Sequence, residues 1–310
     1  MKILLHEELE PKDGLLPLMD HAFRWLYNPW TFQKSVKTDP RLRNSGVGFC
    51  ALENNQVVGF VGMLDLATRT LEGNVEHVGG IFGVATLPGY TRKGVCTALM
   101  NRAHEHFKER GYLFSLLGTS RTIVAHQLYE RLGYRDLLEA QSAYKVTETT
   151  KTEPVEKPAS PKLDLERLLR MYNGHVRDKA GLVVRDEDHY RMFEKNEGLG
   201  GKNCLFDKEG YVLFSDIKQE SWVSGMWIRE LVASDAKVMN RLLERIEKRA
   251  KHLICDRAVL DGLLLEVYRS RSYMVIERSH SVMMVKPLLP KASFSEIYGK
   301  EIHMTGLDFF

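Results

Sequence analysis

The residues best placed to do chemistry lie between Val84 and Met100, where a strand-like run leads through a basic turn into a helix-like pattern. The turn contains Arg92, Lys93 and Gly94. The first amides of a helix have no hydrogen-bond partner within it, and the helix dipole adds positive partial charge beside them. Glycine lets a ligand approach the backbone closely, and the two cations add charge. The segment therefore predicts an anion site, and a pyrophosphate fits it best.

The elements around this turn follow from hydrophobic periodicity. Apolar residues recur every four positions at Val95, Leu99, Ala103 and Phe107, which predicts an amphipathic helix that ends at Gly111. Before this helix, β-branched and apolar runs predict three strands, at 47–52, 57–66 and about 75–86. The first two strands are joined by a hairpin signal at residues 53–56.

A further strand and helix complete the first half. Leu113 to Leu117 is a nearly continuous apolar run, of the kind found in strands covered on both faces. We expect it to pair in parallel with the strand at 75–86, with the helix between them as a right-handed crossover. A second helix, about Thr122 to Leu132, ends at Gly133, and Ser142 to Val146 returns as a last strand. The predicted fold class is α/β with a mixed sheet (α+β).

A chain of 310 residues is long enough for two domains. The segment 148–162 contains three prolines among charged and small residues and almost nothing apolar, which is typical of a linker. We therefore expect one domain at 1–147 and another at 163–288, followed by a C-terminal tail at 289–310.

Composition excludes several other classes of function. With 44 Lys and Arg against 41 Asp and Glu, the net charge of +3 is too small to predict nucleic-acid binding. The four cysteines form no CxxC pair, so neither a zinc site nor a disulfide framework is indicated, and a cytoplasmic location fits best. The N-terminus lacks the apolar core of a signal peptide, and no run approaches the roughly 18 apolar residues that span a bilayer. The oligomeric state stays open, a homo-oligomer included.

The basic turn resembles motif A of the GNAT superfamily of N-acetyltransferases, in which an Arg/Gln-x-x-Gly-x-Gly/Ala loop holds the pyrophosphate of acetyl-coenzyme A. Thr91 stands at the Arg/Gln position, Gly94 at the first glycine and Cys96 at the last position, so two of the three depart from the pattern. Arg92 can supply the basic residue instead. The resemblance implies these coenzyme-binding residues: Phe82, Gly83, Val84, Thr91, Arg92, Lys93, Gly94, Val95, Cys96 and Thr97.

A second block, residues 125–134, resembles the Ala-x-x-x-(Phe/Tyr)-Tyr-x-x-x-Gly-(Phe/Tyr) block of the same superfamily. The matching tyrosine is Tyr129, and in the family this residue lies near the coenzyme sulfur and protonates the departing thiolate. Gly79, Gly80 and Gly83 predict a bulge in the third strand. In the family this strand diverges from its parallel neighbour, which implies that an N–H within residues 82–84 stabilises the oxyanion.

The acceptor amine must lose a proton before it attacks, and the third strand offers two candidate bases, Glu76 and His77. Strand alternation points one of them into a cleft, but a bulge shifts the register, so both stay candidates. Cys96 is an alternative nucleophile at a helix N-terminus, although a packing role is favoured because no His or acid stands at a suitable spacing. His104 and His106 predict no metal site, because a His-x-His pair on a helix points its rings to different faces.

The second half repeats the pattern in weaker form. Strand-like runs at 211–215 and 226–232 precede a helix at about 236–252, but the turn at 233–237 has no glycine and carries an acid. We infer a second GNAT-like domain that has lost coenzyme binding. The tandem resembles the enhanced-intracellular-survival family of acetyltransferases, without the third domain of that family.

In that family the terminal carboxylate can serve as general base. This chain ends in an aromatic tail after a last strand at 282–285, so the resemblance adds Phe310, or Asp308, as a candidate base. A tail that packs on the surface is the alternative.

Together these features predict an acyltransferase, an acetyl-coenzyme-A-dependent N-acetyltransferase that moves acetyl directly to a primary amine of a small molecule or peptide. Acetyl-coenzyme A is the expected co-substrate, with no metal and no nucleic-acid or membrane partner. The alternative is a non-catalytic acyl-coenzyme-A sensor or interaction module, motivated by Thr91 and Cys96. Four aromatic residues are candidates either for the acceptor site or for the core: Trp25, Tyr27, Trp30 and Phe32.

Overall fold

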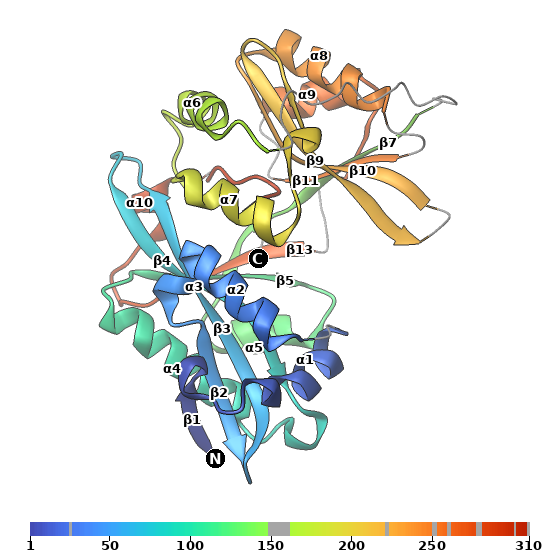
Figure 1. The fold of residues 1–310 in the computed structure, drawn as a ribbon. Coiled ribbons are helices and arrows are strands. Elements are labelled where there is room, and N and C mark those ends of the chain that lie inside the picture. The colour runs from blue at the N-terminus through green and yellow to red at the C-terminus, as the bar shows by residue number, and fades with distance from the viewer. Residues whose placement is uncertain are drawn as a thin grey trace. The chain divides into compact units, whose positions relative to one another are not determined.

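The computed structural model describes residues 1–24, 27–147, 162–220, 223–249, 253–258, 262–276, 281–300 and 302–308. Contacts divide the chain into two compact units, and each unit contains segments from both halves of the sequence. Unit 1 comprises Met1–Leu137 and Met283–Gly299, and unit 2 comprises Leu138–Val282 together with the described residues from Lys300 on. Figure 1 shows that both are built from strands with helices around them.

The sheet of unit 1 has the strand order β1-β2-β3-β4-β5-β13-β6. Its strands are β1 (Lys2–Leu5), β2 (Gly48–Glu53), β3 (Gln56–Arg69), β4 (Val75–Thr86), β5 (Phe114–Ser120), β6 (Arg135–Glu139) and β13 (Ser281–Pro287). Strands β1 to β4 pair antiparallel, whereas β4 and β5 pair parallel, as the sequence predicts. The helices are α1 (Leu16–Phe23), α2 (Pro29–Thr38), α3 (Pro40–Ser45), α4 (Val95–Glu109), α5 (Val124–Arg131) and α10 (Phe294–Tyr298).

Helices cover both faces of this sheet. On one face α4 lies so close that a Cβ added at Gly79 would be 2.4 Å from the Phe107 ring. On the other face, side chains of α1 and α2 pack in one buried cluster with Phe60 and Ala85. Since neighbouring residues of a strand point to opposite faces, alternate residues of β4 face α4 and the α1–α2 cluster.

The sheet of unit 2 has the order β12-β7-β11-β10-β9-β8, with β10 and β11 parallel. Its strands are β7 (Gln141–Val146), β8 (Cys204–Phe206), β9 (Gly210–Glu220), β10 (Val223–Ala233), β11 (Leu253–Ala258) and β12 (Met274–Ile276). Its helices are α6 (Leu165–His175), α7 (Glu187–Asn196), α8 (Ala236–Glu247) and α9 (Gly262–Ser270). Each unit thus holds a mixed sheet with a parallel pair, which confirms the predicted fold class.

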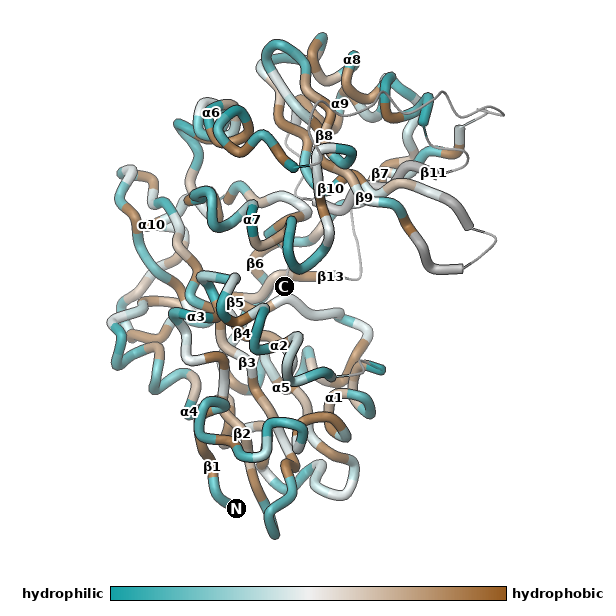
Figure 2. Tube along the Cα trace, viewed as in Figure 1, coloured by the Kyte–Doolittle hydropathy of each residue, from teal (hydrophilic) through white to brown (hydrophobic). Residues whose placement is uncertain are grey.

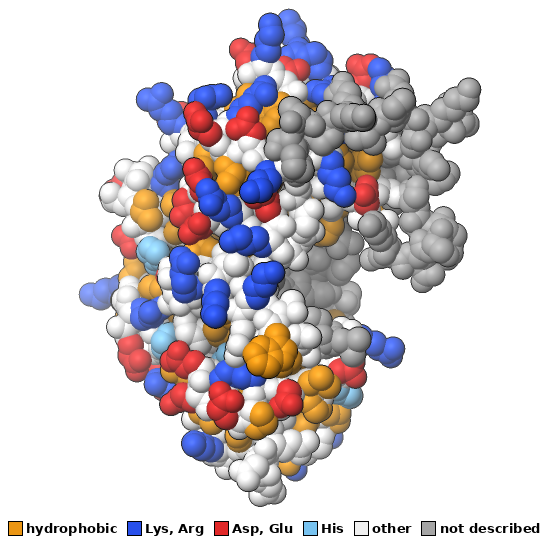
Figure 3. Space-filling view, in the orientation of Figure 1, with side chains coloured by type: hydrophobic (Ala, Val, Ile, Leu, Met, Phe, Trp, Pro, Cys, Tyr) orange, Lys and Arg blue, Asp and Glu red, His pale blue; other side chains and the backbone are white. Residues whose placement is uncertain are grey.

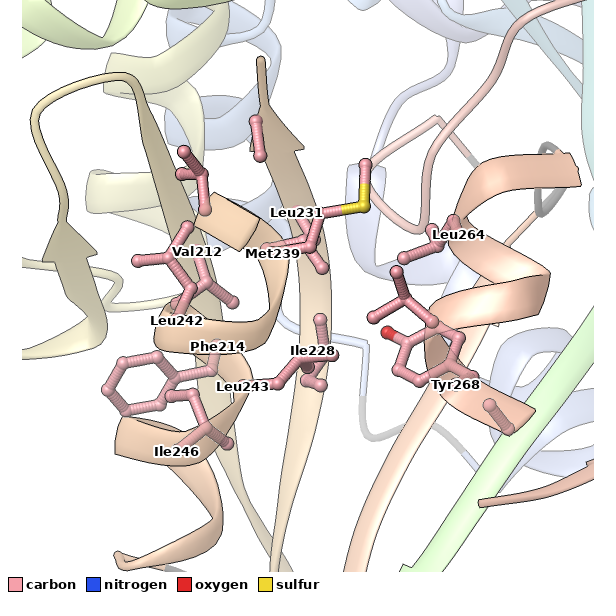
Figure 4. Close-up of a cluster of buried hydrophobic side chains, with 14 of the residues drawn as sticks. Val212, Phe214, Ile228, Leu231, Met239, Leu242, Leu243, Ile246, Leu264 and Tyr268 are labelled. Atoms are coloured by element: carbon pink, nitrogen blue, oxygen red, sulfur yellow. The ribbon is translucent and has the colours of Figure 1, made fainter. Parts of the chain in front are cut away.

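Apolar periodicity builds the core of unit 2. Helix α8 buries Val238, Met239, Leu242, Leu243 and Ile246, three or four positions apart, on one face. Figure 4 shows four of these side chains among strand residues of β9 and β10 and near Leu264 and Tyr268 of α9; the four are Met239, Leu242, Leu243 and Ile246. A second cluster lies under α6 and α7. Figure 2 shows hydrophobic colour along strands and helices and hydrophilic colour at many of the turns between them.

Two strands lie in a different sheet from the one that the sequence suggests. Strand β7 was expected to close the first sheet, but it pairs with β11 and β12 in the second. Strand β13, expected in the second sheet, lies between β5 and β6 in the first. A run of apolar residues specifies that a strand is buried and not which neighbours it finds, so this exchange has no local signal. The compact units therefore differ from the expected division at 1–147 and 163–288.

Charge is mixed over the face of the molecule shown in Figure 3, where Lys and Arg lie among Asp and Glu. That pattern agrees with the small net charge of +3. Within the part of the chain that the structure describes, no helix is long and apolar enough to cross a membrane.

Candidate active site

Strand β4 diverges from β5 in the middle of its length. Their parallel pairing covers only Gly79 to Ile81, although β4 continues to Thr86 and β5 to Ser120. On its other edge, β4 carries the predicted bulge: Phe82 pairs with Gly62 and Ala85 with Phe60, so Gly83 and Val84 together face one residue of β3. Gly83 has a φ of +58°, which favours glycine. The bulge bends β4, so the edge at 82–86 lies outside the parallel pairing with β5.

The turn after β4 leads into α4 with an unusual backbone. Arg92 and Gly94 have φ values of +59° and +80°, and Gly94 is the N-cap of α4 without any side-chain cap. The first hydrogen bond of the helix runs from the Ala98 N–H to the Gly94 carbonyl (2.9 Å). The amides of Val95, Cys96 and Thr97 therefore precede the helical ladder and can bind an anion.

The side chains of the turn differ in their availability. The Thr91 hydroxyl donates to the Pro88 carbonyl (2.8 Å) and so closes the turn itself, which leaves the family's basic position without a cation. Arg92 and Lys93 are exposed, and the Lys93 ammonium lies 5.0 Å from the centroid of the Tyr90 ring. Arg92 and Lys93 therefore stand directly before the amides at the start of α4, and that they bind an anion with these amides stays a prediction.

Tyr129 is buried on α5, with its ring packed edge-on against Tyr134 at 6.0 Å between centroids. Burial, reinforced by the neighbouring Cys96 thiol, raises the pKa of Tyr129. The phenol is therefore protonated at neutral pH and can act only as an acid. Cys96 belongs to the first turn of α4, so Tyr129 lies near enough to this turn for the thiol to affect its pKa.

Cys96 is poorly suited to act as a nucleophile. Burial raises the pKa of its thiol to about 11, so the thiolate is scarce at neutral pH. This is contrary to the lowered pKa that a nucleophile at a helix N-terminus requires.

A buried network of polar side chains next to Tyr129 was not predicted from the sequence. The Tyr134 hydroxyl lies 2.7 Å from the Ser115 hydroxyl and 2.9 Å from His104 Nε2. Burial, with Lys286 and Lys108 nearby, lowers the pKa of His104 to about 3, so the imidazole is neutral. One signal was present: His104 lies on the apolar face of its helix, beside Ala103 and one turn from Phe107. His106 instead packs edge-on against Phe49, so the two imidazoles have different partners.

The two candidate bases point to opposite faces of β4. His77 Nδ1 lies 2.5 Å from the partly buried carboxylate of Asp65, and its ring stacks on Tyr112. Glu76 lies on the other face, where its charge adds to burial in raising the pKa of Tyr298. At about 3.3 Å per residue, His77 is roughly 16 Å along the strand from Phe82, so direct proton transfer at residues 82–84 is out of reach of its ring.

The remaining candidates lie apart from this centre. Asp308 is buried and bound by Arg185 in unit 2, so its carboxylate is already paired. Phe310 and Trp25 lie outside the described residues. Tyr27 and Phe32 are buried in the core, whereas the side chain of Trp30 is 80 % exposed.

The corresponding helix terminus in unit 2 is already filled. The Asp235 carboxylate caps α8 and accepts hydrogen bonds from the N–H groups of Lys237 (2.7 Å) and Val238 (2.9 Å). Strand β10 pairs in parallel with β11 from Gly225 to Ile228 and is irregular immediately afterwards. The acid predicted from the turn therefore occupies the amides that would bind a phosphate. Across the described ranges, no group of three or more His, Cys, Asp or Glu side chains is arranged to hold a metal ion.

Residues 15–134 match the model of the acetyltransferase (GNAT) family. Among solved structures, a GCN5-related N-acetyltransferase from Kribbella flavida is similar at 17 % identity and a TM-score of 0.68, over 93 % of this chain and 72 % of that one. Eis1 from Mycobacterium abscessus is similar at 16 % identity and a TM-score of 0.53, over 83 % of this chain and 71 % of that one. N-myristoyltransferase of Saccharomyces cerevisiae with bound myristoyl-CoA is similar at 11 % identity and a TM-score of 0.61, over 100 % of this chain and 85 % of that one. No curated protein matches the chain.

Proposed function

Because residues 15–134 match the model of the acetyltransferase (GNAT) family, we propose that the protein is an N-acetyltransferase that moves acetyl from acetyl-coenzyme A to a primary amine of a small molecule or peptide. The family match and the fold indicate an acyltransferase that uses an acyl-coenzyme A. Three features together support the finer proposal: amides without a side-chain cap at the start of α4, a buried and protonated Tyr129 whose pKa responds to Cys96 of that same first turn, and the early end of the β4–β5 pairing.

The coenzyme would be held by main-chain groups. Its pyrophosphate would lie on the amides of Val95, Cys96 and Thr97, with charge from Arg92 and Lys93. Its pantetheine arm would pair with the edge of β4 at residues 82–84, which is outside the pairing with β5.

The reaction is a direct transfer. The amine nitrogen attacks the thioester carbonyl, a C–N bond forms, and an N–H within residues 82–84 stabilises the oxyanion. When the C–S bond breaks, the departing thiolate takes the proton of Tyr129, which is then restored from solvent.

Of the two bases on β4, we favour His77. Its Nδ1 faces the Asp65 carboxylate, which leaves Nε2 as the position that takes up a proton. The distance along β4 requires that the amine proton reach this ring through water molecules. Glu76 is the less favoured candidate base, because its side chain lies on the other face of β4.

A cytoplasmic location belongs to the same proposal. It is supported by Cys50, Cys96 and Cys204, which are free thiols.

The decisive experiment compares the two glycines that flank α4. Gly94 and Gly111 both have φ near +80° and open space around the position of a Cβ, but they lie at opposite ends of the helix. Titration calorimetry with acetyl-coenzyme A should show at least a hundredfold loss of affinity for Gly94→Glu, because bulk and negative charge fill the anion site. The matched Gly111→Glu should keep wild-type affinity. Equal affinity in all three proteins would reject the placement of the coenzyme.

Turnover is measured as thiol release from acetyl-coenzyme A with a panel of polyamines, aminoglycosides and peptide amines. Release with at least one amine supports the enzyme. Tight coenzyme binding without turnover on any amine would support the non-catalytic sensor instead.

A further inference from the structure

Helix α5, which carries Tyr129, has eight residues and buries only that one side chain. So short a helix is not stable by itself, and its position depends on groups outside it. Near its start, Asp136 of β6 accepts a hydrogen bond from Arg121 Nε (2.8 Å) and lies 2.9 Å from Nε2 of His126. The N-terminal half of α5 is therefore tied to the neighbouring strand.

The other end of α5 is held by Lys286, which lies 154 residues away in sequence on the exchanged strand β13. The Lys286 ammonium donates a hydrogen bond to the carbonyl of Leu132, just after the last residue of α5. A Cβ added at Gly133 would lie 3.1 Å from the same nitrogen. A cation in this position binds a carbonyl without a helical partner and opposes the negative end of the helix dipole.

The backbone connects this contact to the tyrosine within one turn. The N–H groups of Leu132 and Tyr134 both donate to the carbonyl of Tyr129 (3.0 Å each), and Gly133 N–H donates to Glu130 (2.9 Å). The peptide group that Lys286 binds therefore belongs to the same closed turn as Tyr129. Tyr134, in this turn, also packs its ring on Tyr129.

The surroundings of Lys286 make its contact with the Leu132 carbonyl important for holding the ammonium in place. Its side chain is partly buried, and burial followed by the charge of Lys108 lowers its pKa. The ammonium is also close enough to His104 to contribute to the low pKa of that imidazole. A lysine kept in such a place, facing another cation and a buried imidazole, gains its stabilisation from the carbonyl that it binds.

We propose that Lys286 is a positioning residue for the acid of the reaction: the exchanged strand delivers an ammonium that caps α5 and fixes the hydroxyl of Tyr129 beside the coenzyme sulfur. This inference rests on the proposed function through the role of Tyr129. On this inference, the placement of β13 in the first sheet affects catalysis, because it brings Lys286 to α5.

The test is a double-mutant cycle on thiol release from acetyl-coenzyme A. It uses the best amine of the panel, or water as acceptor if no amine reacts. Lys286→Met removes the donor and keeps the aliphatic stem, Lys286→Arg keeps a donor, and Tyr129→Phe removes the acid. We expect Lys286→Met to lower kcat about tenfold with an unchanged KM for acetyl-coenzyme A. Lys286→Arg should restore most of the rate, and Lys286→Met should cost nothing further when Tyr129→Phe is already present.

Two comparisons separate positioning from folding. Lys108→Met removes the neighbouring exposed charge on α4 and should leave kcat unchanged. Amide exchange should become faster at Leu132, Gly133 and Tyr134 in Lys286→Met, while the amides in the middle of α4 keep their protection.

Each outcome has one meaning. If Tyr129→Phe lowers kcat but Lys286→Met does not, the positioning role is wrong and the proposed function stands. If the two losses add fully in the double variant, Lys286 acts independently of Tyr129 and the inference is also wrong. If Tyr129→Phe has wild-type kcat, the acid role within the proposed function fails, and with it the role given to Lys286.

Discussion

Nη2 of Arg185 donates to both carboxylate oxygens of Asp308, each at 2.8 Å, in the fully buried interior of unit 2. The same guanidinium donates to Glu230, and Thr305 bridges the two acids. One cation therefore binds two buried carboxylates and holds the last described residues of the chain in unit 2.

This arrangement predicts unequal effects of neutralising its members. Arg185→Met leaves Glu230 and Asp308 buried without their cation, which should cost about 3–5 kcal/mol of unfolding free energy. Asp308→Asn leaves one cation with one anion and should cost only about 1–2 kcal/mol. Scanning calorimetry of both variants checks the order. A loss for Asp308→Asn as large as that for Arg185→Met would mean that the net charge of the cluster is not what matters.

His104 predicts a loss of stability in mild acid. Burial lowers its pKa in the folded protein to about 3, from 6.5 in the unfolded chain, so the unfolded state binds more protons between these values. Stability is therefore complete above pH 6.5 and falls as the pH drops toward 3, by about 2 kcal/mol at pH 5.

His104→Gln should remove this pH-dependent loss of stability. Urea unfolding at pH 7 and at pH 5 measures it: the free energy of unfolding of the variant, relative to wild type, should be higher at pH 5 than at pH 7. His6, with a pKa lowered to about 4 by burial and by Lys12, allows the same comparison at a separate site. Parallel pH profiles for wild type and His104→Gln would contradict the assignment.

Tyr129→Phe should lower kcat roughly a hundredfold if the phenol protonates the departing thiolate. The KM for acetyl-coenzyme A should change little, because the main-chain amides of α4 bind the coenzyme. Since burial raises the pKa of Tyr129, the wild-type rate should show no alkaline decline caused by this residue up to pH 9. Single-turnover kinetics with saturating coenzyme separate the chemical step from product release.

The local parts of the site could be predicted from the sequence, because local chemistry specifies them. The change from strand to helix periodicity around Gly94 placed the turn, and glycine at position 83 placed the bulge where a positive φ is needed. The parallel pairing of β4 with β5 followed from the apolar run at 113–117 and an intervening helix. Each of these features follows from a pattern that can be read along one continuous segment of the chain.

The contacts that orient the side chains could not be predicted, because they join distant positions. Nothing near His77 indicates that Asp65 faces it from the adjacent strand. Lys286 reaches α5 only because β13 enters the first sheet, and one apolar strand resembles another in sequence. Likewise, Asp308 looked available as a base until Arg185, 123 positions away, was found to bind it.

The close approach of α4 to β4 at Gly79 gives the last prediction. A Cβ at this position would lie 2.4 Å from Cδ2 and Cε2 of Phe107, whose ring is fully buried, so neither partner can move freely. Gly79→Ala should therefore destabilise unit 1 by about 2–3 kcal/mol through overpacking. Gly174→Ala in α6, where a Cβ meets nothing within 4 Å, should instead stabilise the protein by up to about 1 kcal/mol. If the clash is the cause, adding Phe107→Leu to Gly79→Ala should cost less than the sum of the single losses in thermal unfolding, because the smaller side chain makes room for the methyl group.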